Sequence, residues 1–96
     1  MPYHSTMTSE SRVALVTGGN RGIGFEICRQ LAQTGVDVLL GARDLNKAKD
    51  AADLLAAEGI SVTYRALDVT SAESVKDAVA GIERDKGRLE ILINNA

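Results

Sequence analysis

The sequence predicts an α/β fold in which helices cover both faces of a parallel β-sheet. Short apolar runs alternate with longer amphipathic stretches from residue 12 onward, and consecutive strand–helix units produce this order. A glycine-rich turn separates the first apolar run from the first amphipathic stretch. Because crossovers between parallel strands are right-handed, we expect a doubly wound open sheet of four strands, in the order 3-2-1-4, with three helices.

The first strand–helix unit begins at residue 13. Residues 13–16 are all apolar and predict a strand. The following stretch repeats apolar residues at every fourth position, which gives a helix one apolar face; these residues are Ile23, Ile27 and Leu31. Gly35 is expected to end this helix, and residues 36–40 predict the second strand.

The second helix is expected to begin after Asp44, whose side chain can cap the first turn. Its apolar face consists of Leu45, Ala48, Ala52 and Leu55. Gly59 is expected to end it, and residues 62–67 predict the third strand.

Thr70 and Glu73 have the spacing of a capping box at the start of the third helix. The apolar positions of this helix are Val75, Ala78, Val79 and Ile82, and Gly87 ends it. Residues 89–93 predict a fourth strand, apolar enough to be covered on both faces. Since the sequence ends just after this strand, we expect residues 12–96 to be one half of a longer domain, truncated at a strand end.

The composition argues against several classes of function. The 11 Lys and Arg residues and 13 Asp and Glu residues give a net charge of −2, so no basic nucleic-acid-binding surface is expected. No apolar run reaches the ~18 residues of a membrane span. Residues 1–11 lack the order of a signal peptide and predict a loose N-terminal arm, so a cytoplasmic location is expected. His4 has no second ligand nearby and Cys28 is the only cysteine, so we expect no metal site and a packed thiol.

The glycine-rich turn predicts a site for a dinucleotide. Gly18 can adopt backbone angles that a side chain forbids, Gly22 allows the main chain to approach a ligand, and Gly24 allows the helix to lie close to the sheet. The free N–H groups at the helix start would then face a pyrophosphate. A glycine turn without a ligand is the alternative. The position of the turn between a strand and a helix favours a Rossmann-type fold, with candidate binding residues Gly18, Asn20, Arg21, Gly22, Ile23 and Gly24.

The end of the second strand favours NADP(H) over NAD(H). An NAD site usually has an acidic residue about 20 positions beyond the glycines, to bind the ribose 2′-hydroxyl. At that distance the sequence has Ala42 and Arg43, and the planar guanidinium of Arg43 suits a 2′-phosphate. Arg21 is expected to face the same phosphate. Asp44 could instead bind the ribose, although helix capping is its simpler role.

Three motifs in this order resemble those of the short-chain dehydrogenase/reductase family; they are Thr17-Gly18-x-x-x-Gly22-x-Gly24, Leu67-Asp68-Val69 and Asn94-Asn95-Ala96. Residues 18–27 are most similar to the NADPH-dependent carbonyl reductases of that family. The resemblance implies that Asp68 binds the adenine amino group and that the Val69 backbone meets the adenine ring. It also implies that the stretch from Asn94 to Ala96 borders the adenosine ribose. Taken separately, these residues would be a strand-end acid and a polar turn.

The family performs its chemistry with a Ser, a Tyr and a Lys four positions after that Tyr. Here Met7 follows Tyr3 at that distance and Asp68 follows Tyr64, so no catalytic residue is expected and the chain alone should be inactive. Three functions remain open. The first is the NADP(H)-binding portion of an oxidoreductase for a small carbonyl or alcohol substrate. The others are a non-catalytic NADP(H)-sensing module and an inactive fragment that self-associates through an open sheet edge.

Overall fold

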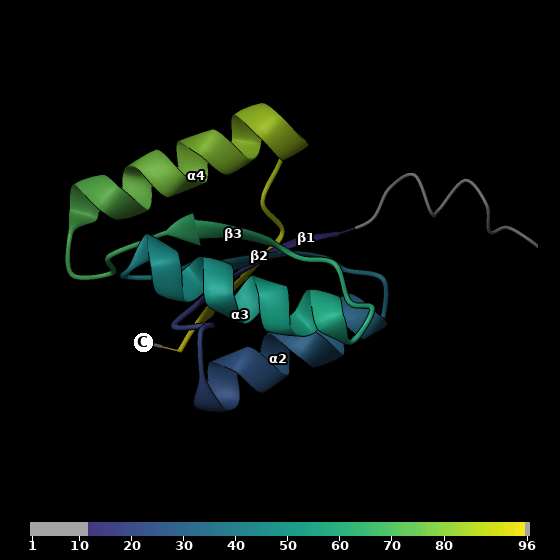
Figure 1. Cartoon of the computed structure of the whole chain (residues 1–96). Coiled ribbons are helices and arrows are strands. Elements are labelled where there is room, and N and C mark those ends of the chain that lie inside the picture. Colours follow the sequence, from purple (N-terminus) through teal and green to yellow (C-terminus); the bar gives the residue numbers. More distant parts are fainter. Residues whose placement is uncertain (1–11, 96) are drawn as a thin grey trace, which may run out of the picture.

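A parallel sheet of four strands lies at the centre of the molecule (Figure 1). The computed structural model describes residues 12–95. Their elements are β1 (Val13–Thr17), α2 (Gly22–Gln33), β2 (Asp37–Ala42), α3 (Leu45–Ala57), β3 (Thr63–Ala66), α4 (Ala72–Lys86) and β4 (Ile91–Asn94). The strand order β3-β2-β1-β4 confirms the predicted doubly wound Rossmann-type arrangement. The predicted N-terminal arm and Ala96 lie outside the described residues.

The sheet is the middle one of three layers. In Figure 1, α2 and α3 cover one face and α4 covers the other. Alternate residues of the strands point to these two faces, so each face has its own apolar core. The first core includes Val16, Val38, Leu40, Cys28 and Leu55. The second includes Val13, Leu15, Leu39, Leu67, Ala78 and Ile82.

Glycines in the left-handed region end both helices of the first face. Gly35 has φ +95°, and its N–H donates to the carbonyl of Ala32 at 3.1 Å. The N–H of Val36 donates to the carbonyl of Leu31 at 3.2 Å, which completes a Schellman motif. Val36 therefore closes α2, and β2 begins one residue later than the sequence pattern predicts. Gly59 closes α3 with the same pair of hydrogen bonds.

Polar side chains cap the N-termini of α3 and α4. The predicted cap at Asp44 is confirmed, because its carboxylate accepts from the N–H of Asn46 at 2.8 Å. The predicted capping box at Thr70 is wrong by one residue. The hydroxyl of Ser71 accepts from the N–H of Ser74 at 3.1 Å and caps α4, whereas the Thr70 hydroxyl donates to Asp68.

The edge strand β4 is more exposed than its apolar sequence predicts. Within residues 12–95, β4 pairs only with β1, and the Leu92 side chain is 57% exposed. The expected coverage of both faces of β4 is therefore not present in this part of the chain. On the other edge, β3 pairs with β2 over residues 63–66 and is shorter than the predicted strand.

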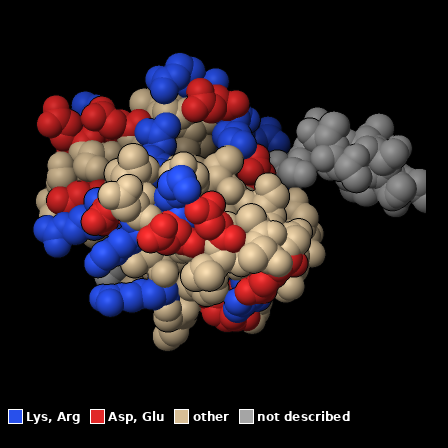
Figure 2. All heavy atoms as spheres, viewed as in Figure 1, with Lys and Arg blue, Asp and Glu red and all other residues tan. Residues whose placement is uncertain are grey.

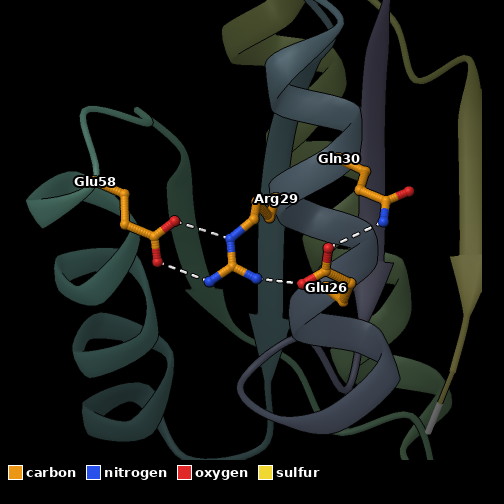
Figure 3. A network of polar contacts seen from close by, with 4 residues as sticks. All are labelled: Glu26, Arg29, Gln30 and Glu58. Carbon is orange, nitrogen blue, oxygen red and sulfur yellow. Dashed lines mark hydrogen bonds and ion pairs between the residues drawn. The ribbon is translucent and has the colours of Figure 1, made fainter.

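Arg29 connects the two helices of the first face (Figure 3). Its Nε and Nη2 donate to the two carboxylate oxygens of Glu58, at 2.9 and 2.7 Å. Its Nη1 contacts Glu26, whose other oxygen accepts from Gln30 at 2.9 Å. The guanidinium also lies 5.1 Å from the ring centroid of Phe25. These contacts join the middle of α2 to the end of α3.

The surface carries both charges. On the face that Figure 2 shows, Lys and Arg side chains are interspersed with Asp and Glu. None of the helices between residues 12 and 95 combines the length and apolar character that crossing a membrane requires.

Candidate functional site

The glycine turn connects β1 to the start of α2 at the carboxyl edge of the sheet. Gly18 and Gly22 have φ of +62° and +61°, a conformation that L side chains rarely adopt. A Cβ on Gly22 would meet no atom within 4 Å, so the backbone faces open space at this point. The structure therefore confirms that Gly18 needs its conformational freedom, and it leaves room for a ligand beside Gly22.

The start of α2 has no side-chain cap. Arg21 occupies the N-cap position in an extended conformation, and its side chain makes no capping hydrogen bond. The first turn also contains no acidic residue. The N–H groups of the first helical turn, which have no partner inside a helix, can therefore bind an anion such as a pyrophosphate. Asn20 is partly buried and Ile23 is 73% exposed beside these groups.

Gly24 allows a very close contact between α2 and the turn. A Cβ built on Gly24 would lie 2.2 Å from the carbonyl oxygen of Gly18 and 2.6 Å from Nδ2 of Asn95. The sequence predicts a close approach of this helix to the sheet. The structure shows that Gly24 lies against the end of β1 and the residue after β4.

Hydrogen bonds join the ends of β1 and β4 beneath the turn. The buried Thr17 hydroxyl donates to Oδ1 of Asn94 at 3.0 Å and accepts from the N–H of Asn95 at 2.9 Å. The side-chain amide of Asn95 donates to the carbonyl of Gly18 at 3.4 Å. Asn94 thus lies beside the end of β1, and Asn95 supports the turn; the contact of Asn94 with a ribose stays a prediction.

Two residues of this region have structural roles that the sequence does not predict. The N–H of Gly19 donates to the carbonyl of Gly41 at 2.9 Å and fastens the turn to β2. A Cβ on Gly19 would lie 2.9 Å from Cγ of Leu40 and 3.0 Å from Sγ of Cys28. Asn95 is the other. The motif places Asn95 beside the ribose, but its support of the turn could not be predicted. Both roles depend on contacts between separate strands.

Arg43 and Asp68 lie at the ends of β2 and β3, where the sequence predicts the adenosine end of the cofactor. Nε of Arg43 is 3.9 Å from Oδ2 of Asp68, and the Arg43 side chain is 78% exposed. Hydrogen bonds from Thr70 and the nearby Arg43 lower the pKa of Asp68 below its ordinary value. Val69 is half-buried against the second core. Arg21 is exposed at the start of α2, and its convergence with Arg43 on one phosphate remains a prediction.

The Cys28 thiol does not contribute to this site. Its side chain is buried in the first core, and burial raises its pKa to about 12. A thiol of this kind is protonated at neutral pH and reacts poorly as a nucleophile.

The amino-acid sequence is similar to those of known dinucleotide-dependent enzymes. A family model described as "short chain dehydrogenase" matches residues 12–96. The chain belongs to the short-chain dehydrogenase family. Carbonyl reductase [NADPH] 1 of Sus scrofa is 43% identical over 91 residues, which are 94% of this chain and 32% of that protein. Carbonyl reductase [NADPH] 3 of Homo sapiens is 44% identical, over 94% of this chain and 33% of that protein.

Solved structures of short-chain dehydrogenases have the same fold. Menthone neomenthol reductase from Mentha piperita superimposes with a TM-score of 0.85 at 44% identity, over 90% of this chain and 31% of that one. A metagenomic short-chain oxidoreductase in complex with NADP gives 0.81 at 35% identity, over 88% of this chain and 38% of that one. The chain therefore spans about a third of the length of these relatives.

Proposed function

We propose that this chain is the NADP(H)-binding portion of a short-chain oxidoreductase that transfers hydride between NADPH and a carbonyl or alcohol substrate. Family membership supports the reaction class. The names of the carbonyl reductases and the NADP complex of the metagenomic relative support the cofactor.

The exposed arginine that follows β2 carries the choice of NADP(H). An NAD site usually has a carboxylate near the end of β2 that binds the ribose 2′-hydroxyl. The acid that follows β2 in the chain is Asp44, and it caps α3: its Oδ1 accepts from the N–H of Asn46. The residue before it, Arg43, is exposed and suits a phosphate.

The residues at the strand ends fit the whole adenosine half of the cofactor. The uncapped first turn of α2 and the open space beside Gly22 suit the pyrophosphate. Arg43 and Arg21 would hold the 2′-phosphate, Asp68 and Val69 the adenine, and Asn94 the ribose. NADPH supplies the hydride when it is bound. The chain's own residues bind and orient it.

We further propose that residues 12–95 supply no proton to the reaction. Tyr64 lies on the edge strand β3, and Asp68 rather than a lysine stands four positions after it. The Ser, Tyr and Lys that the family resemblance implies are not among these residues.

Self-association is a second candidate function, and the exposure of β4 favours it. The outward edge of β4 has no strand partner within residues 12–95, and Leu92 is exposed beside it. Unpaired strand edges are templates for pairing with another chain.

Titration with NADPH, followed by NMR to detect weak binding, tests the proposed cofactor site. In Gly22→Val the new side chain would occupy the space beside the turn, so we expect NADPH binding to be lost. Gly35→Val is the matched control, because Gly35 also has a positive φ and open space around it but lies at the far end of α2. Equal affinities of the two variants would contradict the assignment.

A further inference from the structure

Arg43 and Asp68 are neighbours because of the register of β2 and β3. The ladder pairs Ala42 with Ala66 at its end. One further hydrogen bond, from the N–H of Leu67 to the carbonyl of Ala42 at 2.7 Å, keeps the two backbone segments together beyond the end of β3. Arg43 follows Ala42 and Asp68 follows Leu67, so the two residues are neighbours. Their side chains make the 3.9 Å contact described above.

Thr70 fixes the orientation of the Asp68 carboxylate. Oδ1 of Asp68 accepts from the Thr70 hydroxyl at 2.6 Å and from the Thr70 N–H at 3.0 Å. The N–H of Asp68 donates to the hydroxyl of Ser74 at 3.0 Å, which attaches this turn to the first turn of α4. Because Oδ1 is held by Thr70, Oδ2 is the oxygen that faces Arg43.

The contact with Asp68 involves one edge of the Arg43 guanidinium. Nε is the guanidinium atom that lies 3.9 Å from Oδ2, which leaves the fork of Nη1 and Nη2 to bind two oxygens of a phosphate. An exposed arginine samples many rotamers, and a fixed carboxylate at Nε restricts them. The Asp68 carboxylate is ionised at neutral pH, and the hydrogen bonds from Thr70 lower its pKa further.

We propose that Thr70 is a positioning residue for recognition of the cofactor 2′-phosphate. It acts through Asp68, whose second oxygen holds Arg43 with its fork directed outward. This inference rests on the proposed function, since it presumes that Arg43 meets a 2′-phosphate. Thr70 itself does not touch the phosphate. It acts through the orientation of Arg43, so its effect is on the discrimination between ligands with and without the 2′-phosphate.

Two small probes test this role without enzyme turnover. Adenosine 2′,5′-bisphosphate carries the 2′-phosphate and adenosine 5′-monophosphate lacks it, so the ratio of their affinities measures discrimination. In Thr70→Val we expect the ratio of affinities to fall about two- to fivefold, which corresponds to the free energy that an exposed ion pair contributes. Thr70→Ser keeps the hydroxyl and should retain the ratio. Thr63→Val is the control, because the Thr63 hydroxyl bonds to the carbonyl of Val38 on β2, at the other end of β3.

A second variant makes the test independent of how well Thr70→Val folds. Asp68→Asn keeps the size of the side chain and removes the charge that faces Arg43, so it should lower the same ratio. Any loss of adenine binding cancels, because both probes carry adenine. An unchanged ratio in folded Thr70→Val, or in Asp68→Asn, would overturn the inference and leave the proposed function intact. A wild-type chain that does not prefer the bisphosphate would overturn both.

Discussion

The carboxylate of Asp44 accepts a hydrogen bond from the backbone N–H of Asn46, with 2.8 Å between Oδ1 and N. This bond satisfies one of the free N–H groups at the start of α3. The same carboxylate follows the end of β2, where an NAD-dependent enzyme usually has the acid that binds the ribose. Capping of the helix and binding of the ribose are thus two candidate roles of one side chain.

Asp44→Ala should separate these two roles. We expect a loss of about 1 kcal/mol in the free energy of unfolding, which is typical for removal of an N-cap. The ratio of NADPH to NADH affinity should stay the same, because Asp44 does not bind the ribose. Denaturant unfolding and calorimetric titration measure the two effects, with Asp50→Ala on the exposed side of α3 as the control. A selective loss of NADH affinity would show that Asp44 binds the ribose.

The strand–helix order could be predicted because the apolar pattern of each element agrees with its burial. Residues 13–16 are buried on both faces, as their continuous apolar run indicates. The boundaries depend on hydrogen bonds that the pattern does not contain. Val36 is as apolar as its neighbours, yet its N–H closes α2. Ser71, not Thr70, caps α4, because the Thr70 hydroxyl has a partner in Asp68.

The sequence predicts those site residues whose role follows from their own backbone conformation or side-chain chemistry. Gly18 and Gly22 have the positive φ that glycine allows, and Arg43 lies at the strand end that the count of residues gives. Gly19 and Asn95 act through contacts between strands that are far apart in the sequence. Such contacts follow from the strand register, which a single sequence does not reveal.

Gly24→Ala should be one of the more damaging small substitutions in the chain. The added methyl group would lie 2.2 Å from the Gly18 carbonyl oxygen, so backbone has to move. We expect a loss of about 1 to 3 kcal/mol in the free energy of unfolding, the usual cost of overpacking. Thermal unfolding monitored by circular dichroism measures it. A variant as stable as the wild-type chain would show that α2 and the turn are not in close contact.

The contact between Arg29 and Glu58 predicts a dependence of stability on pH. Hydrogen bonds from Arg29 lower the pKa of Glu58 below its ordinary 4.5 in the folded chain. A lowered folded pKa adds stability above about pH 4.5, and this stability is lost as the pH falls through the folded value. In Glu58→Gln the melting temperature should therefore decline less between pH 6 and pH 3. A curve parallel to that of the wild-type chain would contradict the contact.

Exposure of β4 predicts that Leu92→Lys reduces self-association. A charge beside an unpaired strand edge opposes pairing with another chain, so the apparent mass in light scattering should fall toward that of a monomer. Leu54→Lys is the matched control, because Leu54 is 61% exposed but lies on α3. A wild-type chain that is monomeric over a wide concentration range would argue against the second candidate function.

We propose that this site recognises the 2′-phosphate of NADP(H) through Arg43. The most direct measurement is the ratio of NADPH to NADH affinity in the wild-type chain and in Arg43→Leu, at one fixed ionic strength because salt screens exposed charges. A hydrogen bond to a charged group contributes about 1.5 to 3 kcal/mol, and the exposure of Arg43 favours the lower end. We therefore expect the wild-type chain to prefer NADPH and Arg43→Leu to lose about tenfold of that preference. A wild-type chain that prefers NADH, or an Arg43→Leu variant with an unchanged ratio, would contradict the claim.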